Sequence, residues 1–323
     1  MRSKILEMLR NAGSVYISGE EIASRLGVSR TAVWKHIREL REAGYDIRSH
    51  SRSGYMLCET PDLLLPGEIR HDLNTKIMGQ KIVYYEDIPS TNIEAKRLAA
   101  EGAPEGTVVV SEAQSTGRGR MERAFFSPKG KGIWFSIILR PEFLPQEAPK
   151  CTLLAAVAVA KAMDQFGLRA GIKWPNDVLY EGKKLVGILT EMHAEMDRIN
   201  YVVIGTGINV NIMPEEFPPE LRDCATSLAI MKGEKLPRAA FFRAVLQAIE
   251  ELYLMVRKQG FASLMEEWRH YTITLGQEVN VISVNETFAG RAVDIDADGA
   301  LLVETEQGVR RVLAGDVSIR PRK

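Results

Sequence analysis

The sequence predicts an α+β protein of several domains, with a winged helix-turn-helix at the N-terminus, a central α/β domain built on a mixed sheet, and a small β-barrel at the C-terminus. Three observations support this prediction. The 323 residues exceed the length of one typical domain. Helical periodicity dominates before residue 45, and short strands separated by Gly, Asn and Asp dominate after residue 276. We place the domains at residues 1–62, 66–270 and 274–323.

The composition is ordinary for a soluble globular protein, with 45% apolar and 26% charged residues. The 42 basic and 42 acidic residues cancel, so a polyanionic partner must be met by a local patch. Three widely spaced cysteines, Cys58, Cys151 and Cys224, predict neither a disulfide framework nor a metal site. The N-terminus lacks a long apolar run, and the longest apolar segment, 153–160, is too short to span a bilayer. We therefore expect a cytoplasmic protein with no membrane contact.

The first domain contains two helices with clear end signals. Ser18 and Glu21 form a capping-box pattern, Gly27 is a helix stop, and Ser29 caps a second helix. Two short helices joined by a tight turn that contains glycine form a helix-turn-helix. Two strand-like runs flank a basic, serine-rich turn over residues 45–57, as in the wing of a winged helix. The inward stripe of the second helix is predicted to be Val33, Ile37 and Leu40.

A cationic surface is predicted on the second helix and the wing. Between residues 25 and 55, seven Lys or Arg stand against three Asp or Glu, which is a local excess of +4 in a neutral chain. Such cations can reach phosphates and base edges in a DNA major groove. The alternatives are a helical packing module with a solvated face, or a winged helix that binds protein. The candidate DNA-binding residues are Ser29, Arg30, Thr31, Lys35, Arg38, Arg48 and Arg52.

Two prolines and a glycine at residues 61–67 mark a domain boundary, and we expect the three leucines between them to pack on a neighbouring domain. The central region mixes strands and helices, and hairpin connections such as 195–198 favour a mixed sheet over an alternating βαβ fold. Strands are predicted at 81–86, 107–111, 133–139, 183–191 and 201–211, and helices from 92 to 98, at 151–166, at 237–257 and at 261–270.

A basic, glycine-rich stretch at residues 117–132 lies between two of these strands. Glycine permits positive φ angles and close approach of the backbone to a ligand. Arg118, Arg120 and Arg123 offer planar guanidinium groups that match carboxylate and phosphate oxygens. A loop held by strands at both ends can surround an anion with such groups. The alternative is a solvated basic surface loop.

Polar residues also follow the ends of two predicted strands. Ser90-Thr91-Asn92 precedes a helix, and Gln114 lies just beyond the next strand. Hydroxyl and amide groups at this place can recognise a polar head group. The alternative is that Ser90 or Thr91 serves as a helix N-cap, which explains one of the three residues.

A turn is predicted at residues 173–177, because Pro175 excludes a central strand there. Asn and Asp are common in turns, so the segment alone indicates a turn more than a site. One of the two lysines at 183 and 184 points inward, since side chains of a strand alternate between faces. No P-loop and no complete dinucleotide fingerprint is present. The residues expected to gather at the turn are Trp174, Asn176 and Asp177.

The end of the chain has the pattern of a small barrel. Strands are predicted at 278–282, 287–295, 300–305 and 309–313, with turn signals between them. A domain of about fifty residues is only marginally stable alone. We therefore expect this one to pack against the central domain and to be stabilised by it.

Three motifs in this order resemble the signature of biotin protein ligases. With the N-terminal helix-turn-helix, the chain resembles the bifunctional class in which the ligase also represses the biotin operon. The resemblance covers essentially the whole chain and implies a ligase domain like that of class II aminoacyl-tRNA synthetases and an SH3-like C-terminal barrel. The motifs are Gly117-Arg118-Gly119-Arg120 with Phe126-Ser127-Pro128, then Lys173-Trp174-Pro175-Asn176-Asp177, then Lys184-Leu185-Val186-Gly187-Ile188-Leu189.

The resemblance implies a role for each matching residue. Catalysis is assigned to Lys184 and Arg120, with Asp177 orienting an amine or a metal. A buried urea needs donors and acceptors, which hydroxyls and amides supply. Biotin would be bound by Ser90, Thr91, Asn92, Gln114, Arg118, Gly119, Arg120 and Lys184. The nucleotide would be contacted by Arg118, Arg120, Arg123, Phe125, Trp174, Asn176 and Asn209.

Two departures from the family pattern concern how tightly the loop retains its ligand. Met121-Glu122 stands where the family has Arg-Gly, so that an anion lies beside an anion site. Phe125 stands where the family often has tryptophan, so that a smaller aromatic covers the adenylate. Neither departure changes the assignment of the chain as a ligase.

The resemblance implies that biotin and ATP form biotinyl-AMP with Mg²⁺, and that biotin then passes to a lysine of a biotin carboxyl carrier protein or biotin-dependent carboxylase. Biotinyl-AMP would also be the corepressor of a homodimer bound to operator DNA. One alternative is a lipoate-type acyl ligase, although the Ser-Thr-Asn and Gln set favours a urea over a dithiolane. Another is a biotin-sensing regulator without ligase turnover, against which Lys184 and Arg120 argue.

Overall fold

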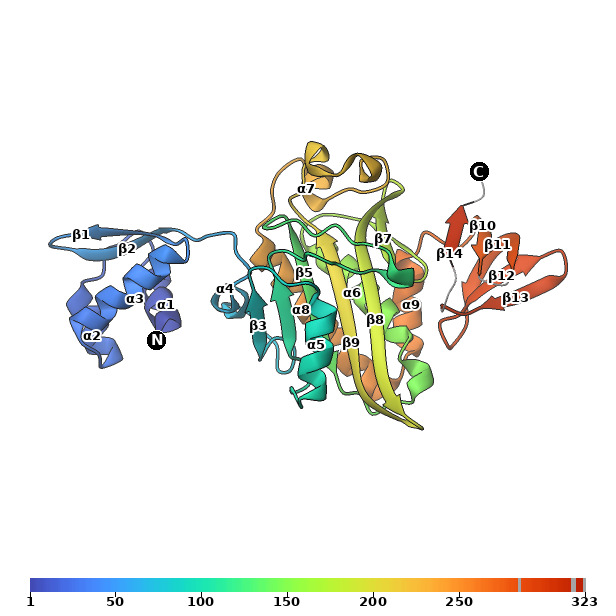
Figure 1. Ribbon diagram of the computed structural model, residues 1–323, viewed down its shortest axis with the longest axis horizontal. Coiled ribbons are helices and arrows are strands. Elements are labelled where there is room, and N and C mark those ends of the chain that lie inside the picture. The colour runs from blue at the N-terminus through green and yellow to red at the C-terminus, as the bar shows by residue number, and fades with distance from the viewer. Residues whose placement is uncertain (284–285, 315–317, 322–323) are drawn as a thin grey trace. The chain divides into compact units, whose positions relative to one another are not determined.

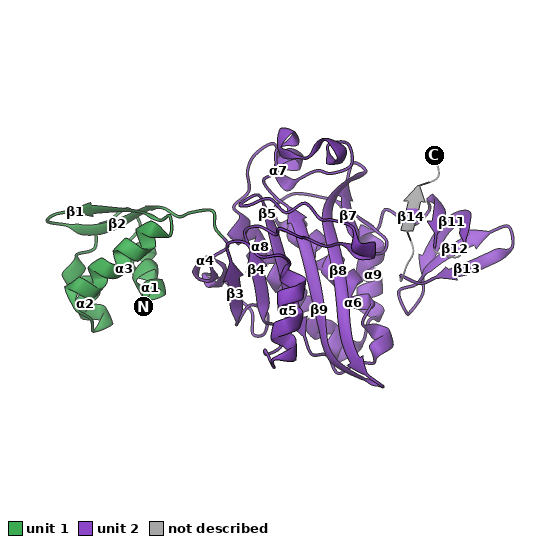
Figure 2. Cartoon of the chain, in the orientation of Figure 1, with its two compact units in different colours: residues 1–63 green, residues 64–323 purple. Residues whose placement is uncertain are grey.

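The computed structural model describes residues 1–283, 286–314 and 318–321. The chain forms two compact units, Met1–Leu63 and Leu64–Lys323 (Figure 2). The first boundary falls within the proline-containing stretch that the sequence marked, and the predicted barrel is part of the second unit. Within the described residues, no helix combines the length and apolar character needed to cross a membrane.

The first unit confirms the predicted winged helix-turn-helix. Its two capping serines act as expected, because Ser18 Oγ accepts the Glu21 N–H at 3.0 Å and Ser29 Oγ accepts the Ala32 N–H at 3.1 Å. Gly27 lies between the helices with a φ of 65°, the left-handed conformation that ends a helix. The elements are α1 (Arg2–Asn11), α2 (Gly19–Leu26), α3 (Arg30–Glu42) and the antiparallel hairpin of β1 (Asp46–His50) and β2 (Gly54–Glu59).

Two details complete this unit. Val33, Ile37 and Leu40 form the buried stripe of α3 that the sequence predicted. The Glu21 carboxylate pairs with Arg25 at 2.7 Å, where the capping-box pattern had predicted a bond back to Ser18. The helix start therefore depends on one half of the expected motif.

A mixed sheet of seven described strands forms the centre of the second unit (Figure 1). The strand order is β3-β4-β5-β9-β8-β7-β6, in which β3 is parallel to β4 and all other neighbours are antiparallel. This confirms the mixed sheet. The strands are β3 (Ile82–Tyr85), β4 (Val108–Ser111), β5 (Gly132–Leu139), β6 (Gly171–Lys173), β7 (Asp177–Tyr180), β8 (Lys183–Glu195) and β9 (Arg198–Asn209).

Helices cover both faces of this sheet (Figure 1). On one face, Ala95 and Ala99 of α5 pack against Val109, Ile138 and Val203. The opposite face packs on α6, α8 and α9, which contribute to the large core. The interior strand β5 is buried along its whole length, as its almost continuous apolar run indicates. The helices are α4 (Pro66–Arg70), α5 (Thr91–Ala100), α6 (Lys150–Gln165), α7 (Leu228–Lys232), α8 (Arg238–Gln259) and α9 (Ala262–Tyr271).

The C-terminal part forms an antiparallel five-stranded sheet in the order β13-β12-β11-β10-β14. It packs against the central domain as predicted. Two hydrogen bonds join them, from Lys150 Nζ to the Ala297 carbonyl and from the Trp174 indole to the Gly299 carbonyl, each at 3.0 Å. The sequence did not predict the last strand. The strands are β10 (Glu278–Ile282), β11 (Thr287–Ile295), β12 (Leu301–Thr305), β13 (Gly308–Val312) and β14 (Ser318–Pro321).

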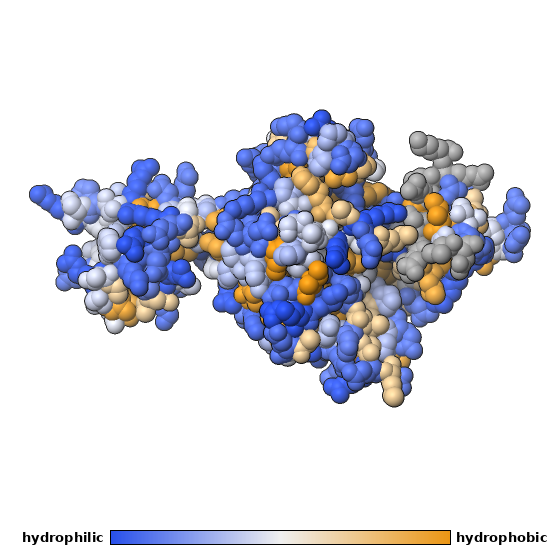
Figure 3. Space-filling view, in the orientation of Figure 1, coloured by the Kyte–Doolittle hydropathy of each residue, from blue (hydrophilic) through white to orange (hydrophobic). Residues whose placement is uncertain are grey.

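The stretch between the two prolines packs as predicted. Leu64 is fully buried in the core of the second unit, and Pro66 occupies the first position of α4, where a missing N–H costs nothing. The face of the molecule shown in Figure 3 is mainly hydrophilic, with scattered hydrophobic residues.

Candidate functional site

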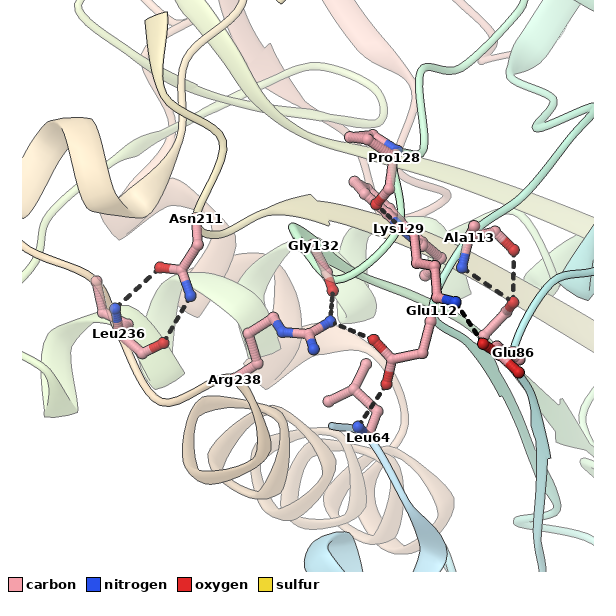
Figure 4. Close-up of polar contacts among 12 residues, drawn as sticks. Leu64, Glu86, Glu112, Ala113, Pro128, Lys129, Gly132, Asn211, Leu236 and Arg238 are labelled. Carbon is pink, nitrogen blue, oxygen red and sulfur yellow. Dashed lines mark hydrogen bonds and ion pairs between the residues drawn. The ribbon is translucent and has the colours of Figure 1, made fainter. Parts of the chain in front are cut away.

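A buried ion pair holds both ends of the loop that contains residues 117–132 (Figure 4). Arg238, at the start of α8, lies 2.8 Å from Glu112, just after β4, and both side chains are fully buried. The guanidinium also donates to the Gly132 carbonyl at the start of β5, at 3.0 Å. The second Glu112 oxygen accepts the Leu64 N–H at 2.7 Å. The loop therefore begins and ends at fixed points, tied to the segment where the second unit starts.

Two lysines hold the last part of the loop. Lys129 pairs with Glu86 (Figure 4), and Lys131 pairs with Glu216 at 2.6 Å. The hydrogen bond from each lysine holds the pKa of its partner carboxyl below the ordinary value. These carboxylates stay charged at neutral pH and fix the chain as it enters β5.

The tip of the loop folds as a small hairpin. The Gly119 N–H donates to the Arg123 carbonyl at 2.7 Å, and the Phe125 N–H donates to the Gly117 carbonyl at 2.8 Å. A Cβ at Gly117 would lie 2.5 Å from the Phe125 carbonyl oxygen, so this close approach requires glycine.

Positive φ angles at the tip fall on residues other than the glycines that the sequence suggested. Met121 and Glu122 both have a φ of 55°, whereas among the loop glycines Gly130 has one, at 72°. Non-glycine residues in this region carry strain of roughly 1–3 kcal/mol each. Both residues form the first of the two departures, so half of this strain lies at position 122, where the resemblance leads us to expect glycine.

A pocket of polar groups forms where α5 begins. Ser90, Thr91 and Asn92 are all buried. Ser90 is the N-cap residue of α5 by position, yet its side chain caps no backbone N–H, so the N-cap alternative does not explain this triplet. Gln114 Oε1 accepts the Thr91 N–H at 2.8 Å and lies 3.1 Å from the Thr91 hydroxyl, and its amide nitrogen donates to Ser127 Oγ at 3.0 Å. These bonds fix the orientation of the Gln114 amide.

Ser136 supports two residues of this pocket from behind and was missed by sequence reasoning. Its hydroxyl lies 2.8 Å from Thr91 Oγ1 and 2.6 Å from Asn92 Oδ1. The Asn92 amide donates onward to the Leu189 carbonyl and the Glu191 carboxylate, at 3.2 and 2.9 Å. A serine within the apolar run of β5 was the available signal, because a buried hydroxyl requires a partner.

Three glycines on β8 and β9 form a floor without side chains. A Cβ at Gly205 would lie 1.9 Å from Asn92 Oδ1, and one at Gly187 or Gly207 would lie 2.6 or 2.4 Å from the Phe125 ring. Gly187 and Gly207 are direct neighbours across the two strands. The resemblance placed Gly207 in a segment that contacts the nucleotide, but sequence reasoning assigned no contact to Gly187 or Gly205, although glycines inside strands often mark a close approach.

Lys184 is the lysine that points into the site. Its Nζ lies 2.8 Å from Asp177 Oδ1 on the adjacent strand and 5.7 Å from the centre of the Phe125 ring. Lys183 instead donates to the Arg222 carbonyl at 3.2 Å. The alternation of strand side chains thus selects one of the two lysines, as predicted.

Arg120 connects the loop tip to two other parts of the unit. Its guanidinium donates to Asn176 Oδ1 at 3.0 Å and to the Ala314 carbonyl at 2.6 Å. Asn176 in turn donates to the Ile188 carbonyl at 3.0 Å. The turn at residues 174–176, which lies within the predicted 173–177, therefore positions the Asn176 amide that binds the Arg120 guanidinium.

Two cavities meet at these cations. The polar pocket has a volume of about 40 Å³ and the larger cavity beside it about 200 Å³. The smaller one has room for only a few waters, and Phe125 of the loop lines it. Four cations and one carboxylate, Asp177, line the larger cavity among the described residues. The residues that line both cavities are Gly119, Arg120, Phe125, Asn176 and Lys184.

The remaining predicted ligand residues lie around these cavities. Arg118 lines the smaller cavity and Arg123 the larger one, and both are exposed. Asn209 is buried, and its amide donates to the Thr226 carbonyl at 2.9 Å. Trp174 is 1% exposed, and its indole N–H faces the barrel. A contact of Trp174 or Asn209 with a nucleotide stays a prediction.

The seven candidate DNA-binding residues all lie on the exposed surface of the first unit. Those from Ser29 to Arg38 belong to the start and outer face of α3, and Arg48 and Arg52 belong to the hairpin. The Ser29 hydroxyl caps α3, so it is committed to the helix. The other six present cations and one hydroxyl to solvent.

Comparison with protein-family models gives three matches along the chain. Residues 84–209 match the Biotin/lipoate A/B protein ligase family. Residues 2–56 match an HTH domain, and residues 274–320 match the Biotin protein ligase C terminal domain. The three matches follow the order of the predicted domains.

Comparison with whole proteins of similar sequence also finds biotin ligases. The chain is 45% identical over 320 residues to the bifunctional ligase/repressor BirA of Bacillus subtilis, an alignment that covers 99% of this chain and 98% of that protein. It is 28% identical to the Escherichia coli protein of that name, over 98% of this chain and 96% of the other. Among solved structures, the biotin protein ligase of Aquifex aeolicus in complex with biotin and ATP has a TM-score of 0.67 and 28% identity, covering 75% of this chain and 100% of that one.

Proposed function

This chain belongs to the family of bifunctional biotin protein ligases and repressors, and on that premise we propose that it joins biotin to ATP in the paired cavities and passes biotin to a carrier lysine. The observation that supports this best is the junction of the cavities. A polar pocket of hydroxyls and amides opens onto a cationic cavity, and Arg120 and Lys184 line both. A urea head would occupy the pocket and a nucleotide the cavity, so that the biotin carboxylate meets the α-phosphate beside these two cations.

The first step is attack of the biotin carboxylate oxygen on the α-phosphorus of ATP. The bond to the bridging oxygen breaks, and pyrophosphate leaves with the electron pair. Two anions must approach each other, so Lys184 and Arg120 offset their repulsion and the charge that develops at phosphorus. Asp177 holds the Lys184 ammonium in place at 2.8 Å, and Asn176 does the same for Arg120 at 3.0 Å.

Mg²⁺ is proposed as the cation that accompanies ATP. This ion is commonly held by one or two carboxylates together with phosphate oxygens. Asp177 fits such a site for two reasons. Among the described residues it is the one carboxylate that lines the larger cavity. Its buried Oδ1 accepts no hydrogen bond and has only the ion pair with Lys184. When bound, the ion neutralises phosphate charge.

The second step is attack of a carrier lysine ε-amine on the carbonyl carbon of the mixed anhydride. An amide bond forms, AMP leaves, and the amine loses a proton to solvent. Until then the anhydride must be kept from water. Phe125, which lies over Gly187 and Gly207, and the loop tip at residues 117–125 provide that cover.

The test is transfer of radiolabelled biotin to a biotin carboxyl carrier domain with and without ATP and Mg²⁺. We expect ATP-dependent labelling of one lysine. Labelled lipoate in the same assay should stay unused, since a dithiolane leaves the amides and hydroxyls of the pocket unpaired. Biotin-dependent DNA binding without any labelling would instead indicate a sensor that has lost turnover.

The exposed cations of the first unit support the repressor half of the proposal. We propose that biotinyl-AMP favours a homodimer that binds an operator of two half-sites, since dimeric helix-turn-helix proteins read such sites. All components would meet in the cytoplasm. A gel-shift on the promoter of the biotin genes should show tighter binding when biotin and ATP are present. An unchanged shift would exclude the coupling.

A further inference from the structure

Trp34 differs from every other tryptophan of the chain. The sequence contains four, and Trp134, Trp174 and Trp268 are at most 1% exposed, whereas Trp34 is 53% exposed. It lies on the outer face of α3, four residues after Arg30 and four before Arg38. Residues at this spacing share one face of a helix. The large apolar side chain therefore stands among the predicted DNA-binding residues, although it was not one of them.

The surroundings of Trp34 are cationic and concave. The Arg38 guanidinium lies 5.2 Å from the centre of the indole ring. A hollow of about 680 Å³ separates α3 from the hairpin of the same unit. Its lining includes Arg30, Thr31, Trp34, His50 and Tyr55.

The charge of this face fits a polyanion. Arg38 and Arg48 have exposed carboxylate neighbours, Glu42 at 3.5 Å and Asp46 at 4.0 Å, and such exposed pairs are weak. The other three cations make no ion pair with any described residue, which leaves them available for phosphates. They are Arg30, Lys35 and Arg52.

The place of Trp34 on α3 indicates what its ring would meet. The early residues of a recognition helix approach base edges in the major groove, and Trp34 is the fifth residue of α3. Among the four bases, thymine alone presents a methyl group in that groove, and apolar side chains recognise it. The indole N–H could reach a single acceptor such as a purine N7, but the broad apolar face of the ring matches only the thymine methyl group.

We propose that Trp34 is a specificity-determining residue of the DNA-binding face and that it packs against a thymine C5-methyl group in the major groove of duplex DNA. Arg38 holds the ring from one side. The neighbouring cations bind phosphates and carry no sequence preference. This inference rests on the proposed operator binding and assigns to it a preference for thymine at one position of each half-site.

The first measurement uses the intrinsic fluorescence of the full-length protein. Because the other three tryptophans are buried, quenching by acrylamide reports mainly on Trp34, and the Trp34→Phe variant gives the background. The probe is a duplex selected by the wild-type protein from a random library, with biotin, ATP and Mg²⁺ present. We expect the selected duplex to protect Trp34 from quenching. Unchanged quenching in the saturated complex would overturn the proposal.

The second measurement replaces thymine by uracil, one position at a time, in the selected duplex. Loss of the contacted methyl should weaken wild-type binding about fourfold, the value expected for one buried methylene. Trp34→Ala should bind the thymine duplex about that much more weakly and show no preference for thymine over uracil. Lys35→Ala is the matched control, since it should weaken binding to both duplexes equally.

The outcomes separate this inference from the function on which it rests. If the wild-type protein selects a duplex but tolerates uracil at every position, Trp34 does not read thymine and the proposal is wrong. If Trp34 becomes protected on dimerisation without DNA, the ring belongs to a protein interface and the proposal is wrong. If no duplex is selected at all, the operator-binding function itself fails. The Trp34 variants should melt at the wild-type temperature, because the side chain is exposed.

Discussion

The polar pocket and the loop tip belong to one ligand site but are built in opposite ways. In the pocket, Thr91, Gln114 and Ser136 are held by hydrogen bonds between 2.6 and 3.1 Å within a buried frame. At the tip, Met121 and Glu122 are exposed and hold positive φ angles. The pocket is preorganised, whereas the tip is strained and accessible.

This difference matches the two tasks of the site. Recognition of a small head group gains from donors and acceptors that are already in place, because little entropy is then lost on binding. Retention of an intermediate requires a cover that opens for substrates and closes over the product of the first step. The buried pair of Glu112 and Arg238 is compatible with both tasks, since it fixes the ends of the loop without constraining the tip.

The largest effect should follow from breaking the buried ion pair that fixes the two ends of the loop. Arg238→Met leaves Glu112 buried without its cation, and breaking such a pair costs about 3–5 kcal/mol. We expect a corresponding loss in the free energy of unfolding, measured by urea denaturation, and a disordered loop.

The double variant Glu112→Gln/Arg238→Met is the control for that experiment. It removes both charges and keeps an acceptor for the Leu64 N–H, so stability should largely return. If Arg238→Met alone unfolds at the wild-type urea concentration, the loop ends are not held by this pair.

The second-largest effect is expected when a cation is removed where the two cavities meet. Lys184→Ala removes a group aimed at the charge that develops on the α-phosphate, and such groups contribute roughly 10²–10³ in rate. We expect biotinyl-AMP synthesis to fall by about that factor in a single-turnover assay. Lys183→Ala is the matched control on the other face of the strand and should change the rate little. Equal loss in both variants would remove the role assigned to Lys184.

A smaller effect is expected when the rigid pocket is disturbed. A Cβ at Gly205 would lie 1.9 Å from Asn92 Oδ1, so Gly205→Ala must displace the Asn92 amide. Loss of one hydrogen bond in the pocket costs about 1–2 kcal/mol, which is about a five- to thirtyfold rise in the Kd for biotin by calorimetry. The affinity for ATP should stay near the wild-type value. Parallel losses for both ligands would mean that the pocket is not separate from the nucleotide cavity.

The smallest effect concerns the tip itself. Glu122→Gly should relieve strain of about 1 kcal/mol in the closed loop, and biotinyl-AMP should leave the enzyme a few-fold more slowly. Glu122→Ala removes the same charge but keeps the positive φ. If both variants slow release equally, the charge of Glu122 governs retention and the strain does not.

Sequence patterns predicted most of the frame because they are local. Ser18 and Ser29 cap their helices, and alternation along β8 selects Lys184, since each depends on neighbours a few residues away. Ser136 and Gly205 were not predicted as site residues. Their role depends on partners 44 or more residues distant, and no periodicity in either strand reveals that distance.

The sequence by itself determined the order of the domains, the cationic face of the first unit and the residues of the ligase motifs, because these are properties of composition and short-range spacing. The tertiary structure alone decided which of those residues meet. It placed Arg120 against Asn176, joined the two cavities at Lys184, and shifted the strained backbone from the glycines to Met121 and Glu122. The physical reason is that burial, ion pairing and backbone strain depend on how segments distant in the sequence pack together. Local sequence patterns do not report on that packing.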